Sequence, residues 1–179
     1  MKKVLIISSS LRKNSNSEQL AVSFADGAKS AGHDVELVSL RDKEIKFCIG
    51  CLACQKTKRC FMHDDADAIR EKMLHADVLV FATPIYYYEM SGALKTMLDR
   101  ANPLYPSDYQ FREVYALATA AEDETYVPQK AFAGIEGWVD CYEKAKLVGT
   151  LFCGAVTNIG EIKDNPKLRE AYDLGKKIL

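Results

Sequence analysis

Four of the six cysteines in the chain lie close together in the sequence, in a C-x₂-C-x₂-C-x₅-C arrangement made by Cys48, Cys51, Cys54 and Cys60. Thiolates at such short spacing can wrap one metal centre, because each turn of the loop returns a sulfur toward a common point. Three interpretations remain open at this stage. The cysteines could hold an iron–sulfur cluster, they could bind zinc with His63 as a further ligand, or they could be free, redox-active thiols.

A polar run from Ser8 to Ser17 directly follows the first strand-like segment. It contains hydroxyls, amides and two cations just before a predicted helix, where free backbone N–H groups and the helix dipole favour an anion. The alternative is a capping box formed by Ser15 and Glu18, which accounts for only two residues of the run. We therefore predict a phosphate site, made by Ser10, Arg12, Ser15, Asn16 and Ser17.

Three consecutive tyrosines follow another apolar strand-like segment and cannot all point into a core. Aromatic faces at the carboxyl end of a strand suit a flat conjugated ring. The alternative is ordinary surface or interface tyrosine, since tyrosine is enriched where proteins meet. We predict that such a ring is bordered by Pro84, Ile85, Tyr86, Tyr87 and Tyr88. We assign Thr119, at the end of a later strand, to its far edge.

Alternating apolar and amphipathic segments predict the elements that position these residues. The strand-like runs cover residues 4–8, 34–40, 78–82, 114–121 and 147–156, and a helical pattern follows each one, the last two at 128–144 and 165–178. Strict βα order argues for an open, doubly wound α/β fold. Its five-stranded parallel sheet has the order 2-1-3-4-5, with helices on both faces. The chain, residues 1–179, is expected to be a single domain, with its site where the carboxyl ends of the first and third strands meet.

Charge and hydropathy narrow the functional classes. Lys and Arg number 24 and Asp and Glu 25, for a formal charge of −1, so the basic excess typical of nucleic-acid or acidic-membrane binders is missing. The sequence has no apolar run of the ~18 residues that a membrane helix needs. The first apolar run is too short for a signal-peptide core, so we expect a cytoplasmic protein with reduced cysteines.

A phosphate site and a flat aromatic site on adjacent loops of such a sheet together describe a cradle for FMN. The S-x-R-x-x-S-N-S run of residues 10–17, with the T-P-I-Y run of residues 83–86 and the helix after it, resembles the flavodoxin-like NAD(P)H-dependent FMN reductases. The resemblance covers nearly the whole chain. Tyr88 departs from it, because the family usually has a small residue there, so the pocket is expected to be narrower or the ring shielded differently.

The resemblance implies an FMN enzyme that takes reducing equivalents from NAD(P)H and passes them to a quinone, free flavin, metal ion or protein. It needs no acid–base side chain and assembles as a homodimer or homotetramer. The cysteine run is similar to the compact motif of the iron–sulfur flavoproteins, which implies a 4Fe-4S cluster. The alternative is an electron-transfer flavoprotein, either a non-catalytic carrier or a cluster-bearing protein reduced by ferredoxin. The charge of −1 argues against a simple carrier, since such carriers are usually strongly acidic.

Overall fold

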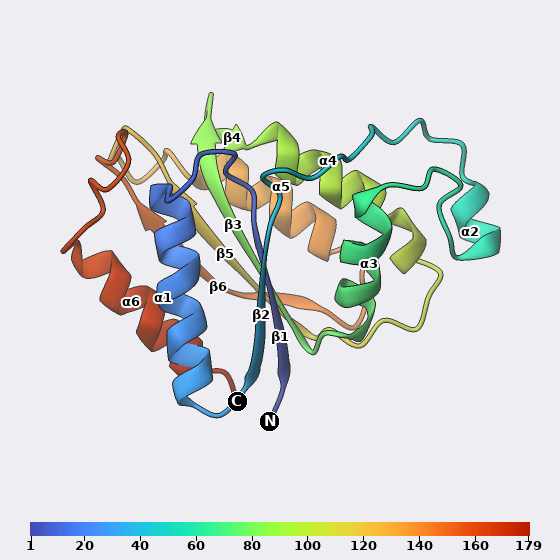
Figure 1. Ribbon diagram of the computed structural model, residues 1–179, viewed down its shortest axis with the longest axis horizontal. Coiled ribbons are helices and arrows are strands. Elements are labelled where there is room, and N and C mark those ends of the chain that lie inside the picture. The colour runs from blue at the N-terminus through green and yellow to red at the C-terminus, as the bar shows by residue number, and fades with distance from the viewer.

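A parallel sheet forms the centre of the computed structural model, which describes residues 1–179 (Figure 1). Its strands are β1 (Lys3–Ser8), β2 (Asp34–Ser39), β3 (Val78–Tyr86), β5 (Glu113–Thr119) and β6 (Lys146–Cys153). They lie in the order β2-β1-β3-β5-β6, with every neighbouring pair parallel. Counted along the chain, this is the predicted order 2-1-3-4-5, which is thereby confirmed.

Helices cover both faces of the sheet, as Figure 1 shows. They are α1 (Asn16–Ser30), α2 (Ala53–Thr57), α3 (Asp65–His75), α4 (Gly92–Arg100), α5 (Gln129–Val139) and α6 (Pro166–Lys176). Helices α1 and α6 pack on one face, and α3, α4 and α5 on the other. Neighbouring residues of β1 face opposite cores: Ile6 packs beneath α1 and Ile7 beneath the other helices, and both are fully buried. The central strands are therefore apolar on both sides, as parallel strands between helices must be.

Two glycines let α1 and α6 approach closely. A Cβ added to Gly27 would lie 1.9 Å from the carbonyl oxygen of Tyr172, and one added to Gly175 would lie 2.1 Å from that of Phe24. Only a residue without a side chain fits at either crossing point. This contact fixes α6 against α1, and with it the segment between β6 and α6.

The structure also contains elements that the sequence did not predict. A short strand, β4 (Glu89–Met90), pairs antiparallel with the end of β3 and makes the sheet six-stranded. Helix α2 lies within the cysteine segment, and a 3₁₀ helix, η1 (Asn102–Leu104), follows α4. Helix α5 ends at Val139 rather than near residue 144, because the chain turns there and buries Tyr142 among other aromatic rings. None of the helices is both long and apolar enough to cross a bilayer.

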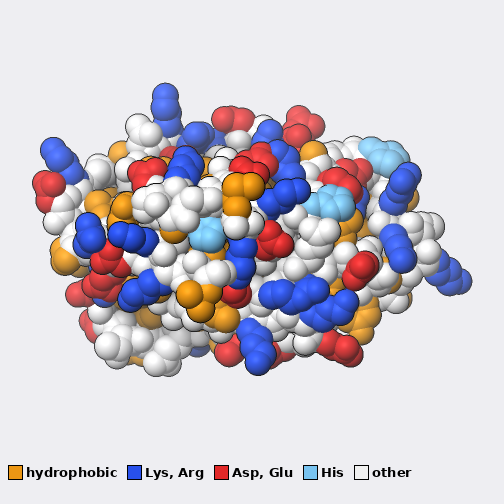
Figure 2. Space-filling model, turned by 90° about the horizontal axis from the view of Figure 1, so that it is seen from below, with side chains coloured by type: hydrophobic (Ala, Val, Ile, Leu, Met, Phe, Trp, Pro, Cys, Tyr) orange, Lys and Arg blue, Asp and Glu red, His pale blue; other side chains and the backbone are white.

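The amino ends of the strands form a face on which acidic and basic side chains are intermixed (Figure 2). A groove of about 340 Å³ lies beside β1 and β2, lined largely by charged residues. Several of these charges pair with one another, as Lys72 does with Glu36 and His75 with Glu71. The predicted site residues lie at the opposite end of the sheet.

Candidate functional site

A cleft of about 270 Å³ lies at the carboxyl ends of the strands, the end at which open α/β sheets bind ligands. Nine of the predicted residues line it: Ser10, Arg12, Ser15, Asn16, Ser17, Pro84, Ile85, Tyr86 and Thr119. The structure therefore brings the polar loop and the start of the tyrosine run to one cavity. Four further residues line it that were not predicted as site residues, namely Ala120, Ala121, Val156 and Thr157. The first two continue the strand end at Thr119, which was a usable signal. The other two follow β6, and no local pattern marks them.

The polar loop and the first turn of α1 form one wall of the cleft. Ser15 caps α1, and its hydroxyl accepts a hydrogen bond of 3.2 Å from the backbone N–H of Glu18. The Glu18 carboxylate reaches back to the N–H of Asn14 at 2.8 Å. A cap is therefore present, yet Ser15 also lines the cleft beside Ser10 and Ser17, all three of them buried. Buried hydroxyls at the start of a fifteen-residue helix suit a bound anion.

Arg12 brings a positive charge to this wall. Its guanidinium forms no ion pair with any carboxylate within 4 Å, and instead Nη1 donates a hydrogen bond of 2.8 Å to the carbonyl oxygen of Thr157. Among the residues that line the cleft, Arg12 is the only charged one. An anionic ligand in the cleft would therefore meet a guanidinium that is not engaged in a direct ion pair.

The tyrosine run divides at a tight turn. Strand β3 continues to Tyr86, which pairs with Glu89 of β4, so Tyr87 and Tyr88 form a two-residue hairpin turn. Both have left-handed backbones, with φ of 52° and 67°, as a type I′ turn requires. Tyr86 lines the cleft, whereas Tyr87 is 99% exposed at the tip of the hairpin.

Tyr88 also lies outside the cleft. Its hydroxyl donates a hydrogen bond of 3.0 Å to Glu122, and its ring lies near Tyr126 and Lys130. The hydrogen bond to Glu122 raises the pKa of Tyr88. The structure thus does not bring Tyr87 and Tyr88 to the cleft with the other predicted residues, because the turn points one outward and folds the other onto the loop after β5.

A buried chain of hydroxyls joins the strand ends beneath the cleft. The Ser91 hydroxyl donates to the Ser9 hydroxyl at 2.8 Å, and Ser9 donates to the carbonyl oxygen of Ala82 at 3.1 Å. The backbone N–H of Ser91 donates to the Thr83 hydroxyl at 2.9 Å. Ser91 is also the N-cap of α4, since its hydroxyl accepts from Leu94 N–H. These contacts fix β1, β3 and α4 relative to one another.

The cysteine run lies between β2 and α3, outside this cleft. Its four predicted thiols line one mostly apolar pocket: Cys48, Cys51, Cys54 and Cys60. Cys48 and Cys51 are exposed, Cys60 is half-buried, and Cys54 is buried. The Cys54 sulfur accepts a hydrogen bond of 3.2 Å from the side-chain amide of Asn102. Burial raises the pKa of the Cys54 thiol despite this hydrogen bond.

The pocket does not have the form of a single-ion site. No three Cys, His, Asp or Glu side chains of the chain converge closely enough to hold one metal ion. His63, the candidate zinc ligand, is absent from the pocket lining and interacts with Asp67 at 3.2 Å.

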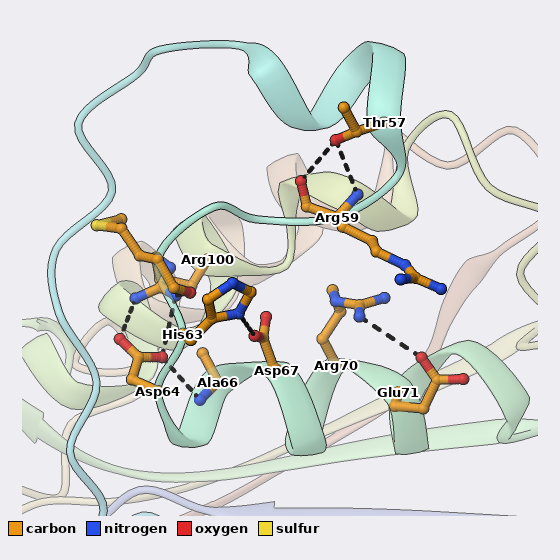
Figure 3. A network of polar contacts seen from close by, with 10 residues as sticks. Thr57, Arg59, His63, Asp64, Ala66, Asp67, Arg70, Glu71 and Arg100 are labelled. Atoms are coloured by element: carbon orange, nitrogen blue, oxygen red, sulfur yellow. Dashed lines mark hydrogen bonds and ion pairs between the residues drawn. The ribbon is translucent and has the colours of Figure 1, made fainter.

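Arg100, at the end of α4, anchors both ends of the cysteine segment. Figure 3 shows its contacts with Asp64. Its guanidinium contacts Asp64 at 2.5 Å and donates to the carbonyl oxygens of Lys46 at 2.8 Å and Met62 at 3.1 Å. Burial alone would raise the pKa of Asp64, but the hydrogen bonds from Arg100 and from backbone N–H groups lower it. Arg100 also lines the pocket of the four cysteines, and its Nε atom is buried without a hydrogen-bond partner.

The model of the family described as NADPH-dependent FMN reductase matches residues 2–126. An iron–sulfur flavoprotein of Methanocaldococcus jannaschii is 37% identical over 102 residues, 57% of this chain and 53% of that protein. An iron–sulfur flavoprotein of Methanosarcina thermophila is 28% identical over 165 residues, 92% of this chain and 83% of that protein. The match to the first of these relatives thus spans only about half of its length.

Solved structures show the same fold. A NAD(P)H:quinone oxidoreductase from Methanothermobacter marburgensis superposes with a TM-score of 0.77 over 98% of this chain and 94% of its own, at 18% identity. An azoreductase from Bacillus anthracis gives 0.75 over 99% of this chain and 100% of its own, at 16% identity. At such identities the likeness shows that the flavodoxin-like fold is shared.

Proposed function

Because the chain belongs to the NADPH-dependent FMN reductase family, we propose that it is an FMN-dependent oxidoreductase that moves reducing equivalents from NAD(P)H to an acceptor. The observation that carries the proposal is the cleft itself. One wall has buried hydroxyls, a helix N-terminus and the guanidinium of Arg12, and the other has Pro84, Ile85 and Tyr86. A ligand with a phosphate at one end and a flat ring at the other matches both walls.

The residues of the cleft bind different parts of FMN. The phosphate is held by the polar set of Ser10, Arg12, Ser15, Asn16 and Ser17. The ring is bordered by Pro84, Ile85, Tyr86 and Thr119, and the hydroxyl chain beneath them fixes the distance between the two walls. FMN, when bound, supplies the hydride and electron chemistry, and the protein supplies orientation and polarity.

The cleft also explains why no acid–base residue is needed. No carboxylate and no histidine lines it. Hydride transfer between stacked rings needs alignment rather than a proton donor. We therefore assign Tyr86 and its neighbours to positioning, and no residue to general acid or base catalysis.

The test is steady-state kinetics on the full chain loaded with FMN. Oxidation of NADH or NADPH is followed at saturating quinone, with free flavin and ferric chelates as further acceptors. We expect turnover with at least one nicotinamide and one acceptor. A protein that binds FMN but oxidises neither nicotinamide is an electron carrier, which would overturn the proposal.

A second function, electron transfer through a 4Fe-4S cluster, is favoured by two observations. The four thiols of the cysteine run line a common pocket, and several curated relatives are named iron–sulfur flavoproteins. The pocket encloses about 20 Å³, so cluster binding requires the chain around the exposed Cys48 and Cys51 to open. In this alternative, the four thiols would hold the cluster, which would supply electron transfer to a small-molecule or protein acceptor.

We also propose that the chain assembles with copies of itself. Tyr87 is almost fully exposed at a hairpin tip beside the cleft, where an aromatic side chain would gain from burial against a second copy. Light scattering coupled to size exclusion tests this, and a monomer at micromolar concentration would contradict it.

A further inference from the structure

The segment after β6 closes one side of the cleft. Val156 and Thr157 line the cavity, although they lie beyond residues 2–126, the part of the chain that the family model matches. This side of the cleft is therefore formed by residues that the family model does not match. Its shape depends on one carboxylate, that of Glu161.

Glu161 binds the turn that precedes it. Its Oε2 accepts from the backbone N–H groups of Thr157 at 2.6 Å and Asn158 at 2.8 Å, and its Oε1 accepts from the Asn158 side-chain amide at 2.7 Å. These hydrogen bonds lower the pKa of Glu161, so the side chain is ionised at neutral pH. Hydrogen bonds to a charged acceptor are stronger than those between neutral groups.

The backbone of Thr157 and Asn158 also binds two residues of the opposite wall, Arg12 and Asn16. The carbonyl oxygen of Thr157 accepts from Arg12 Nη1 at 2.8 Å, and that of Asn158 accepts from Asn16 Nδ2 at 2.9 Å. The Asn16 side chain also accepts from the backbone N–H of Ile162 at 3.3 Å. Arg12 and Asn16 are thus held by backbone groups on either side of Glu161.

Peptide geometry connects these two sets of contacts. The Thr157 carbonyl and the Asn158 N–H belong to the same peptide unit, which is planar and trans, so they point in opposite directions. By holding the Asn158 N–H, Glu161 directs the Thr157 carbonyl away from itself and toward Arg12. Without that contact the peptide plane is free to rotate, and Arg12 loses its fixed acceptor.

We propose that Glu161 is a positioning residue for the phosphate end of the flavin, acting through the Thr157–Asn158 peptide on the guanidinium of Arg12. The inference rests on the proposed function, since it takes FMN as the ligand of the cleft. It assigns a specific role to the C-terminal segment: fixing the one charged side chain of the cleft before the ligand arrives. Such prior ordering reduces the entropy lost on binding.

The test compares two flavins that differ only in the phosphate. Dissociation constants for FMN and riboflavin are measured by flavin fluorescence quenching for the wild-type chain, Glu161→Ala and Glu161→Gln. We expect Glu161→Ala to weaken FMN about tenfold while riboflavin affinity changes less than about twofold, because the lost contact acts on the phosphate end. Glu161→Gln should restore part of the affinity, since its amide oxygen can still accept from the backbone N–H groups.

A double-mutant cycle tests whether Glu161 acts through Arg12. In an Arg12→Ala background, Glu161→Ala should have no further effect on FMN affinity. Glu170→Ala on α6 is the matched control, because Glu170 pairs with Lys167 at 2.9 Å and does not line the cleft. Thermal unfolding of each variant reports whether the segment still folds.

Three results would overturn the inference: unchanged FMN affinity in Glu161→Ala, an equal loss for riboflavin, or an additive loss in the Arg12→Ala background. The last two would mean that Glu161 only maintains the fold of the segment. A wild-type chain that binds neither flavin would be a different failure, because it would remove the proposed function and the inference with it.

Discussion

The Arg100 guanidinium and the Asp64 carboxylate form an ion pair of 2.5 Å, with side chains only 1% and 4% exposed. The pair joins the end of α4 to the start of α3, where Asp64 also caps the helix through the N–H of Ala66. Asp64 further accepts from the backbone N–H of Lys46 at 3.0 Å. A single buried contact thus organises both ends of the cysteine segment.

Removing one partner should therefore be costly. Asp64→Asn leaves the buried guanidinium without a counter-charge, and we expect it to lower the free energy of unfolding by about 3–5 kcal/mol. Urea denaturation measures the change. Asp99→Asn is the matched control, since the Lys95–Asp99 pair is exposed and should contribute less than about 0.5 kcal/mol. Similar losses in the two variants would contradict the assigned role of the buried pair.

The same pair predicts a dependence of stability on pH. The pKa of Asp64 is lower in the folded chain than its ordinary value of 3.8, so its stabilising effect is complete above that value. As the pH falls below it and through the lowered pKa, the carboxylate takes up a proton and the effect is lost. The difference in unfolding free energy between wild type and Asp64→Asn should therefore shrink below about pH 3.8. A difference that stays constant down to pH 2 would rule out this account.

The cysteine pocket predicts the metal content of anaerobically purified protein. We expect iron and inorganic sulfide in equal amounts, with a broad visible absorbance beside the flavin bands. Cys51→Ser should remove most of the iron, because it deletes one of the four pocket thiols. Cys141→Ser is the control, since Cys141 is exposed and lies outside that pocket. Iron-free wild-type protein, or equal iron in both variants, would contradict the cluster.

The division of the tyrosine run predicts that neighbouring tyrosines differ in effect. Tyr86→Ala removes a ring from the cleft wall and should weaken FMN and riboflavin alike, by about tenfold. Tyr87→Ala changes a side chain at the hairpin tip and should leave both affinities within about twofold in the monomer. Fluorescence quenching measures both. A larger effect from Tyr87 would place that residue at the flavin of another copy.

The crossing of α1 and α6 predicts opposite effects for two glycine substitutions. Gly27→Ala forces a methyl group against the Tyr172 carbonyl and should destabilise the chain by about 1–3 kcal/mol, lowering the Tm by several degrees. Gly137, exposed on α5, has nothing within 4 Å of an added Cβ. Gly137→Ala should therefore stabilise the chain, by up to about 1 kcal/mol. Calorimetry measures the Tm of both variants. An unchanged Tm in Gly27→Ala would mean that α1 and α6 can move apart to accept the methyl group.

The sheet and its strand order could be predicted because β1 and β3 are apolar on both faces, a pattern that depends on sequence neighbours alone. The hairpin after Tyr86 could not, since two-residue turns with left-handed backbones normally carry Gly, Asn or Asp rather than Tyr87 and Tyr88. For the polar wall of the cleft, a helix N-terminus gave a local signal.

The hydrogen bond between Arg12 and Thr157 could not be predicted in this way, because the two residues lie 145 positions apart in the sequence. The only local hint was the spacing of Asn158 and Glu161, which matches that of a polar cap followed three residues later by glutamate. Long-range contacts of this kind depend on how α6 packs against α1, which the pattern of either helix alone does not specify.

Helix α4 is capped by Ser91, beneath the cleft, and ends at Arg100, which lines the pocket of the four cysteines. Nine helical residues span roughly 14 Å as a rigid rod, so the spacing between the cleft and the cysteine pocket is set by one element and does not vary with the loops around it. Inserting one residue within α4 would turn its far end by about 100° and swing Arg100 away from Asp64. Relatives that have both the cleft and the cysteine pocket are therefore expected to differ in the length of the surrounding loops but to keep the length of α4.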